Sequence, residues 1–153
     1  MTEFKRGFSL VEVIISIGIA AIIGGMAELA INPGGQLAKA RNSERLSDLN
    51  VIALHIQSNI DDNRTGVFSC VAGDIPTSPK KMASSGTSTY NIAPCIVPTY
   101  FHTMPYDPKA SGAHYTSNTD YDTGYYIIKS SSTGQITLSA PGAELSQTIS
   151  ITR

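Results

Sequence analysis

Histidine and cysteine are the residues of this chain best suited to catalysis or metal binding, and both are scarce. The three histidines, His55, His102 and His114, are far apart in the sequence. No Ser-His-Asp motif, HExxH motif or glycine-rich phosphate loop accompanies them. His55 falls between apolar residues of an expected helix, where a packed or surface histidine is the simpler interpretation. The sequence therefore predicts that the chain is not an enzyme.

Cys70 and Cys95 are the two cysteines of the chain. In an exported domain an even number of cysteines favours a disulfide. Here it would close a loop of about 25 residues and stabilise the fold by about 3 kcal/mol in chain-entropy terms. Two free buried thiols are the alternative. Without a nearby pair of histidines the two residues make a poor zinc site. We predict that Cys70 and Cys95 are joined.

Asp107, Asp120 and Asp122 lie in loop sequence rich in tyrosine and glycine. Hard cations such as calcium bind carboxylate oxygens of this kind. Aspartates in turns more often accept hydrogen bonds from the local backbone, and no EF-hand spacing is present. The prediction is therefore that the chain has no metal or other cofactor, with calcium at these three residues as the alternative.

A single carboxylate also lies near the start of a long apolar segment. Residues 8–31 are mostly apolar and follow a short basic leader. At about 1.5 Å per residue a helix of this length reaches about 36 Å, enough to cross a hydrocarbon core of about 30 Å. Glu12 has apolar sequence on both sides, and a charge there costs several kcal/mol in lipid unless it is paired. Glu12 is therefore a candidate functional residue.

Residues 5–12, KRGFSLVE, resemble the processing site of type IV prepilins, a family that includes type IV pilins and the pseudopilins of type II secretion. The family pattern is a glycine before the cut, usually a phenylalanine after it, and a glutamate at the fifth mature position. Gly7, Phe8 and Glu12 match all three. The resemblance implies cleavage between Gly7 and Phe8 by a prepilin peptidase, followed by N-methylation of Phe8. It covers about residues 5–31 and fades beyond them.

The resemblance also implies a structural function. The precursor would lie in the lipid of the cytoplasmic membrane as a single-pass protein with its N-terminus inside. After trimming, it would assemble with copies of itself and with other pilins through the hydrophobic helix, using the pilus or type II secretion machinery. The product would be an extracellular pilus or a pseudopilus of the periplasm and cell envelope. In such a filament Glu12 would meet the Phe8 amine of a neighbouring subunit.

Three alternatives to this interpretation remain at the level of the sequence. The leader and apolar run also fit an ordinary secretory signal with a cleavage site at residues 25–27. The position of Glu12, the length of the run and the helix-forming sequence after it favour the prepilin. The chain could instead be a membrane-anchored binding module, such as a minor or competence pilin that captures DNA or a surface, or an anchored enzyme.

Three observations on charge and loops bear on ligands. The net charge is −1, which gives no indication of a nucleic-acid partner. Lys80-Lys81 is the one adjacent basic pair after the apolar run, and a solvated pair is its simpler interpretation. Some pseudopilins bind calcium in a loop similar to the one that holds Asp107, Asp120 and Asp122.

The elements that would position these residues define three segments. We expect a leader over residues 1–7, a transmembrane and filament-core helix over 8–31, and an exported globular domain over 32–153. In that domain, residues 36–62 predict an amphipathic helix, since apolar residues recur at three- and four-residue steps. Its apolar face comprises Leu46, Leu49, Ala53, Ile56 and Ile60. The charged residues mostly off that face, which suggest a solvated or subunit-facing surface, are Lys39, Arg41, Glu44, Arg45 and Asp48.

Helix breakers lie between the two helical segments, in the sequence NPGG of residues 32–35. We expect a kinked, nearly continuous helix, and two separate helices are the alternative. Residues 67–90 are irregular and predict a long surface loop. Residues 124–129, 135–139 and 148–152 predict strands, the first two joined as a hairpin, and a short edge strand is expected near 95–101. The predicted fold is α+β and pilin-like: a long N-terminal helix packed on a small antiparallel sheet.

Overall fold

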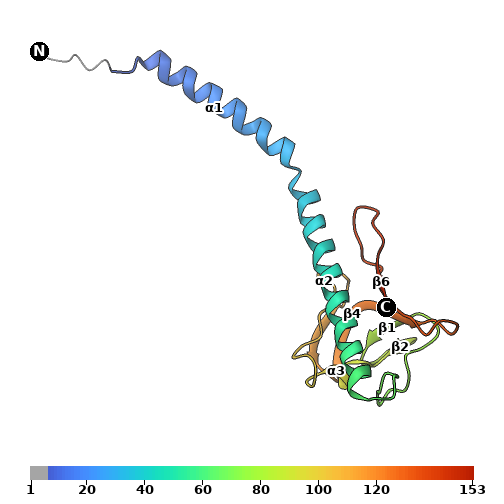
Figure 1. Ribbon diagram of the computed structural model, residues 1–153. Coiled ribbons are helices and arrows are strands. Elements are labelled where there is room, and N and C mark those ends of the chain that lie inside the picture. Colours follow the sequence, from blue (N-terminus) through green and yellow to red (C-terminus); the bar gives the residue numbers. More distant parts are fainter. Residues whose placement is uncertain (1–6) are drawn as a thin grey trace, which may run out of the picture. The chain divides into compact units, whose positions relative to one another are not determined.

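The computed structural model describes residues 7–153, except for the side chains of residues 26–31. Residues 1–6 of the predicted leader lie outside the described residues. The chain divides into two compact units, Met1–Leu37 and Ala38–Arg153, and each is described by itself. Figure 1 labels their helices and strands in chain order.

Unit 1 contains helix α1 (Leu10–Ile31), which lies where the sequence predicts the first helix. It begins after Ser9, whose extended backbone (φ −71°, ψ 144°) precedes the first turn, and it ends at Asn32 in the left-handed region (φ 42°). Within the described residues, no helix combines the length and the apolar character needed to cross a membrane. Within the predicted span, residues 8–31, the structure does not describe the side chains of residues 26–31.

Helix α2 (Pro33–Asp62) begins three residues earlier than the predicted start at residue 36. Asn32 caps it, because its Oδ1 atom accepts a hydrogen bond of 3.1 Å from the Gly35 amide. Pro33 occupies the first helical position, where its missing N–H is not needed. The sequence at residues 32–35 is therefore a helix start as well as an interruption. A single residue, Asn32, separates α1 from α2.

Unit 2 contains a six-stranded sheet that α2 covers. The strands are β1 (Lys80–Ala83), β2 (Thr89–Tyr90), β3 (His114–Ser117), β4 (Asp120–Lys129), β5 (Ile136–Ala140) and β6 (Ile149–Thr152). Their order is β2-β1-β4-β5-β6, and β3 also pairs with β4. The predicted strands correspond to β4, β5 and β6, which pair as an antiparallel meander.

The sheet is mixed, whereas the sequence predicted an antiparallel one. β1 and β2 run parallel, with Lys81 opposite Thr89 and Met82 opposite Tyr90. The short connection between them reverses direction twice, which Gly86 (φ 128°) and Ser88 (φ 66°) permit through left-handed backbone. Part of the predicted surface loop over residues 67–90 is therefore sheet, and Phe68, Ile75 and Met82 within it are buried.

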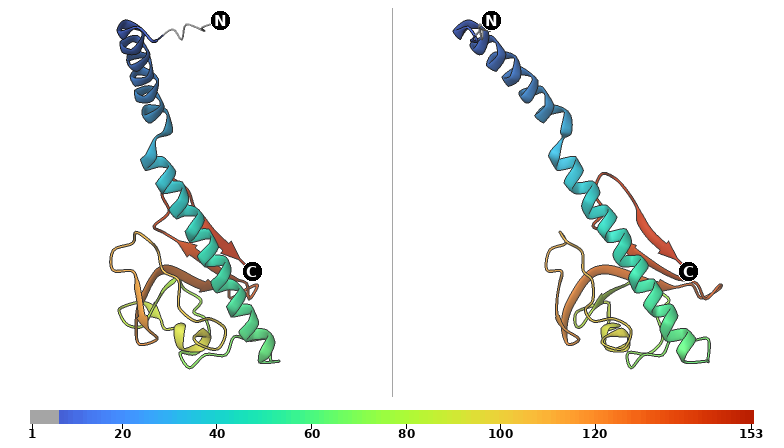
Figure 2. Two further views of the ribbon diagram at one scale, coloured as in Figure 1. Left: turned by 90° about the vertical axis from the view of Figure 1, so that its left-hand side faces the viewer. Right: turned by 60° about the vertical axis from the view of Figure 1, so that its left-hand side comes forward.

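The core of unit 2 lies between α2 and the sheet. Leu49, Ile52 and Ile56 of α2 are buried in one cluster with side chains of β1, β4 and β5. Both views of Figure 2 show α2 running along one face of the sheet. This arrangement gives the α+β class that the sequence predicted.

The edge strand expected near residues 95–101 is absent from the described residues, and helix α3 (Ala93–Ile96) takes part of its place. Pro94 lies in the first turn of α3, where a proline is well tolerated. Ala93 and Ile96 are fully buried, so the segment is held by core packing and not by ladder hydrogen bonds.

Candidate processing and assembly site

The residues at the predicted cut, Gly7 and Phe8, precede α1 and are exposed. Phe8 retains 80% of its accessible surface. A Cβ atom added at Gly7 would meet no atom within 4 Å. Exposed, non-helical backbone of this kind is accessible to a peptidase.

The described part of α1 is apolar on every side. Consecutive helical residues are about 100° apart, so apolar residues at nearly every position leave no polar face. The exposed large apolar side chains of this segment are Leu10, Val11, Val13, Ile14, Ile15, Ile17, Ile19, Ile22 and Ile23. The described part of α1 therefore presents a continuous exposed apolar surface.

Glu12 is the one ionisable side chain among residues 7–25. It lies in the first turn of α1, where the helix dipole favours a negative charge. Its backbone oxygen accepts a hydrogen bond of 2.7 Å from the Ser16 hydroxyl. Within the described residues its carboxylate has no ion pair, and its side chain is exposed.

Residues 4–27 match the prokaryotic N-terminal methylation motif. This motif is the signature of type IV pilins and pseudopilins, so the resemblance recognised in the sequence is confirmed. It covers Gly7, Phe8 and Glu12, and it marks structural subunits and not an enzyme family. A search of curated proteins and a search of solved structures each find no match to the chain.

Outside the methylation motif, Cys70 and Cys95 form the disulfide that the sequence predicted, with a Cα–Cα distance of 5.1 Å. Asn59 of α2 supports the same region. Its Nδ2 atom donates to the Ser69 and Cys95 carbonyls, and its Oδ1 atom accepts from the Ser69 amide. The disulfide loop is thereby attached to the end of α2.

The structure does not bring the three candidate calcium ligands into one cluster. Asp107 is buried against Arg45, Asp122 is paired with Lys81, and Asp120 lies 3.1 Å from His114 Nε2. In the part of the chain that the structure describes, no group of three or more His, Cys, Asp or Glu side chains could hold a metal ion. Each of the three carboxylates instead has a partner from the protein.

The histidines are also not brought together. His55 packs on Phe101 with ring centroids 4.8 Å apart, and its burial lowers its pKa. His114 has a raised pKa because its ring nitrogens contact the Gly112 carbonyl and Asp120. His102 is exposed. The basic pair at residues 80–81 is engaged as well, since Lys81 pairs with Asp122 and Lys80 donates to the Ser88 hydroxyl.

A buried ionic cluster joins α2 to the loops after α3 and β5, and sequence reasoning missed it. Arg45 is completely buried and forms two parallel hydrogen bonds to Asp107, of 2.8 and 2.9 Å. Asp107 also accepts from the Lys109 and Ala110 amides. Burial by itself raises the pKa of Asp107, but the hydrogen bonds from Arg45 and the two amides outweigh it, so the pKa is below its usual value.

Glu144 extends the cluster toward solvent. It pairs with Arg41 at 2.6 Å, with Lys109 at 2.6 Å and with Arg45 at 3.3 Å. The hydrogen bonds from Arg41 and then Lys109 hold the pKa of Glu144 far below its usual range. Asn42 donates a hydrogen bond from Nδ2 to the Glu144 carbonyl and accepts one at Oδ1 from the Glu144 amide. The loop before β6 is therefore fixed to α2.

Gly142 makes room for this cluster. A Cβ atom at this position would lie 2.5 Å from Asp107 Oδ2, which a real side chain could not tolerate. The close approach of the chain after β5 to the Arg45–Asp107 pair thus requires glycine.

The inward face of α2 differs from the predicted apolar face. Arg45 was assigned to a solvated or subunit-facing surface but is buried, whereas Leu46 was assigned to the apolar face and is 46% exposed. The inward face of α2 comprises Ala38, Asn42, Arg45, Leu49, Ile52, Ala53, Ile56 and Asn59. Arg45 lies four residues before Leu49, and Asn42 lies three residues before Arg45. This helical spacing is the sequence signal that could have placed Arg45 and Asn42 on the inward face.

Proposed function

We propose that this chain is a structural subunit of a type IV pilus or a related pseudopilus. The observation that carries the proposal is the methylation motif on a helix whose described side chains are apolar all round. Such a helix is not suited to water by itself, and neighbouring copies could cover it.

In this proposal α1 has two successive surroundings. The precursor lies in the lipid of the cytoplasmic membrane, where the basic leader stays on the cytoplasmic side. A prepilin peptidase then cuts between Gly7 and Phe8, and Phe8 is N-methylated. The trimmed chain next moves into a filament, where α1 packs against other copies and other pilins.

Glu12 has a defined part in assembly. Cleavage creates a new positive charge on the amine of Phe8, four residues away in the same chain. The Glu12 carboxylate of one copy then pairs with the Phe8 amine of a neighbour. This pair removes two uncompensated charges from an apolar environment and sets the axial register of the copies.

Unit 2 is the part that faces the outside of the cell. Its disulfide suits an oxidising compartment. Its fold is complete without α1, because its core and its ionic cluster come from residues after Leu37. It can therefore remain folded while α1 changes from a lipid to a protein environment.

N-terminal sequencing of the membrane and sheared-filament fractions tests the proposal. The mature chain is expected to begin at methylated Phe8 and to be present in sheared filaments. A Gly7→Val variant should accumulate as uncleaved precursor, because a branched side chain does not fit next to the cut. The matched control is Gly18→Val, at a second glycine with open space around it, which should be cleaved normally.

Two results would contradict the proposal. A mature chain that begins at Glu28 would establish an ordinary secretory signal. If the chain is methylated normally but is never found in sheared filaments, the proposed processing is correct and the proposed structural function is wrong.

A further inference from the structure

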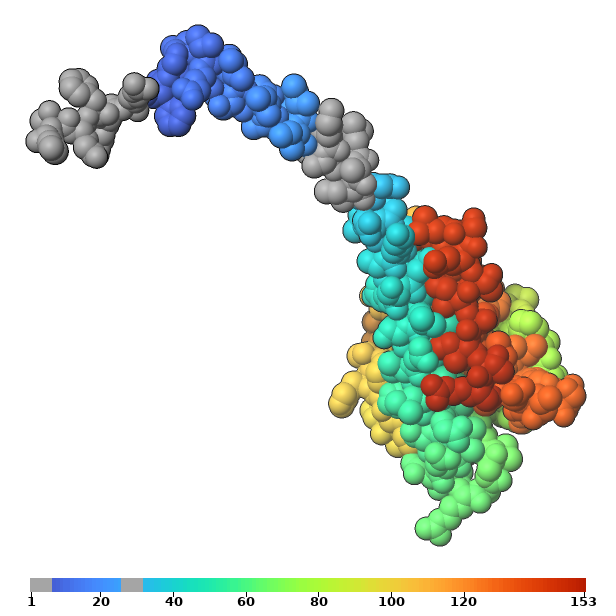
Figure 3. All heavy atoms as spheres, turned by 45° about the horizontal axis from the view of Figure 1, so that its top comes forward, coloured from blue at the N-terminus to red at the C-terminus, as the bar shows by residue number. Residues whose placement is uncertain are grey.

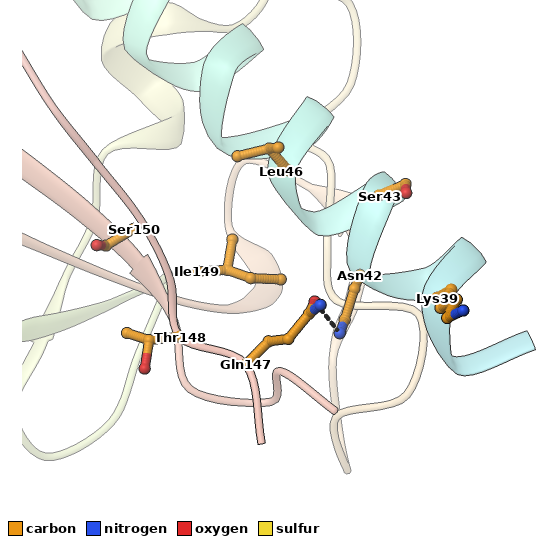
Figure 4. A pocket seen from close by; sticks show the side chains of 8 residues that line it. All are labelled: Lys39, Asn42, Ser43, Leu46, Gln147, Thr148, Ile149 and Ser150. Atoms are coloured by element: carbon orange, nitrogen blue, oxygen red, sulfur yellow. Dashed lines mark hydrogen bonds between the residues drawn. The ribbon is translucent and has the colours of Figure 1, made fainter. Parts of the chain in front are cut away.

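Two grooves flank α2 in unit 2, and they differ in charge. The first, the amide groove, has a volume of about 630 Å³. Its residues are Lys39, Asn42, Ser43 and Leu46 of α2 and Gln147, Thr148, Ile149 and Ser150 beside β6. Figure 4 shows the hydrogen bond from Asn42 to Gln147 that joins its two walls. Lys39 is its one charged residue.

The second, the acidic groove, has a volume of about 430 Å³. Its residues are Glu44 and Asp48 of α2 and Thr103, Met104, Pro105, Tyr106 and Pro108 of the loop after α3. Glu44 and Asp48 are four residues apart, so two like charges lie next to each other on the helix. Tyr106 is 45% exposed and offers an aromatic face beside the carboxylates.

The charged residues of the two grooves do not take part in the ion pairs of unit 2. Asp74, Asp107, Asp120, Asp122 and Glu144 each have a basic partner within the described residues. Glu44, Asp48 and Lys39 have none among those residues. Asp48 accepts a hydrogen bond of 2.7 Å from the Tyr125 hydroxyl, and its pKa is raised, mainly by burial. A cation placed in the acidic groove would relieve this unfavourable arrangement.

Lys39 cannot be that cation within its own chain. At 3.6 residues per turn, Glu44 and Asp48 lie about 140° and 180° around α2 from Lys39. The two grooves are thus on opposite sides of one helix, with opposite charge. Complementary surfaces on different sides of a subunit join copies head to tail, and they generate a ring if the rotation closes and an open helical assembly if it does not.

We propose that the two grooves meet between neighbouring copies of this chain, with the Lys39 ammonium of one copy placed between Glu44 and Asp48 of the next. The inference rests on the proposed filament and identifies a second contact in it, made by unit 2. The aliphatic part of Lys39 packs along Tyr106 of the neighbour, and its ammonium replaces water at the two carboxylates.

Carbodiimide cross-linking of intact wild-type filaments tests the inference, because this reagent joins an amine to a carboxylate only where they touch. Filaments are assembled from a mixture of ¹⁴N- and ¹⁵N-labelled chains and analysed by mass spectrometry. We expect a Lys39–Glu44 or Lys39–Asp48 link between peptides of different isotopic composition. The Lys129–Asp74 pair, 2.7 Å apart within one chain, serves as the internal positive control. Solubilised single subunits should show links within one chain, such as Lys129–Asp74, Lys109–Glu144 and Lys81–Asp122, and none from Lys39.

Charge reversal gives a second measurement on the same contact. Lys39→Glu places like charges together and should lower the yield of sheared filament about tenfold. Lys39→Glu combined with Glu44→Lys restores opposite charges and should recover most of the yield. The matched control is Arg64→Glu, which makes the same change of charge at an exposed turn outside both grooves.

The outcomes separate this inference from the proposed function. Intact filaments that show the Lys129–Asp74 link but no link from Lys39 would overturn it. A loss of yield in Lys39→Glu that the second substitution does not recover would do the same. If the wild type forms no filament at all, the failure lies with the proposed function itself.

Discussion

Helices α1 and α2 use apolar residues in opposite ways. The described part of α1 exposes apolar side chains around its whole circumference, and Glu12 is its one charge. In α2 a single inward face is buried, and charged residues such as Lys39 and Glu44 occupy the flanks. Figure 3 shows the α2 segment and the chain around β6 side by side on the surface of unit 2. The difference is that unit 2 has a core of its own, whereas the described part of α1 leaves its apolar side chains exposed.

In the proposed filament, a division of this kind would separate assembly from folding. Apolar burial contributes about 25 cal/mol per Å², so the exposed isoleucines of α1 are a large reserve of free energy available only on association. The stability of unit 2 instead comes from its core, its disulfide and its ionic cluster. Substitutions in the two regions should therefore have different consequences, and each prediction below tests that separation.

The largest effect is expected for Glu12→Val. Membrane insertion should be unchanged or improved, because a charge is removed from the apolar segment. The yield of sheared filament should fall more than about tenfold, because the Phe8 amine of the neighbour loses its partner. Urea unfolding of unit 2, followed by the near-ultraviolet circular dichroism of its tyrosines, should not change.

Glu12→Asp, the variant with the same charge, should give an intermediate yield because its shorter side chain reaches less far. Expression of each variant beside the wild type, with comparison of membrane and filament fractions, provides the measurement. An unchanged filament yield for Glu12→Val would refute the pairing.

The next effect is expected in unit 2, for Asp107→Ala. This change leaves the fully buried Arg45 without its main partner and should destabilise unit 2 by about 3–5 kcal/mol. The double variant Arg45→Met with Asp107→Leu should be much less harmful, because it removes both charges. If the double variant is as unstable as Asp107→Ala, packing and not the unpaired charge determines the loss. The same unfolding signal measures both variants.

A smaller loss is expected when the disulfide is removed. Cys70→Ser with Cys95→Ser opens a loop with a sequence separation of 25 residues. In chain-entropy terms this costs about 3 kcal/mol. Processing at Gly7 should continue, since the cut lies in the other unit. Mass spectrometry without reduction should show linked Cys70 and Cys95 peptides in the wild type, and alkylation of both thiols without prior reduction would contradict the structure.

The smallest predicted effect concerns acid pH. The folded state depresses the pKa values of Asp107 and Glu144, so their contribution to stability is present above the unfolded-state values near 4. It should be lost as the pH falls below about 4 and both groups take up protons. Arg41→Gln removes the main partner of Glu144 and should make the stability of unit 2 less sensitive to acid. If the stability of unit 2 falls as steeply below pH 4 in that variant, titratable groups other than Glu144 are responsible for the loss.

The sequence alone gave a correct account of the parts that depend on local pattern. The methylation motif is a contiguous run of residues, and α1 is a contiguous apolar segment. The hairpin of β4 and β5 and the last strand, β6, follow from short alternating runs with turn residues between them. The pair Cys70–Cys95 was predictable because the chain has only two cysteines.

The tertiary structure decided the features that join distant residues. Arg45 and Asp107 are 62 positions apart, and local pattern assigned one to solvent and the other to a loop. The parallel pairing of β1 with β2 and the helix α3 were likewise missed. Their segments are short, and core contacts outweigh their weak intrinsic preferences. Helical periodicity determines which residues share a face of α2, but only the folded unit determines that a charged residue on that face is buried, because its partner comes from another part of the chain.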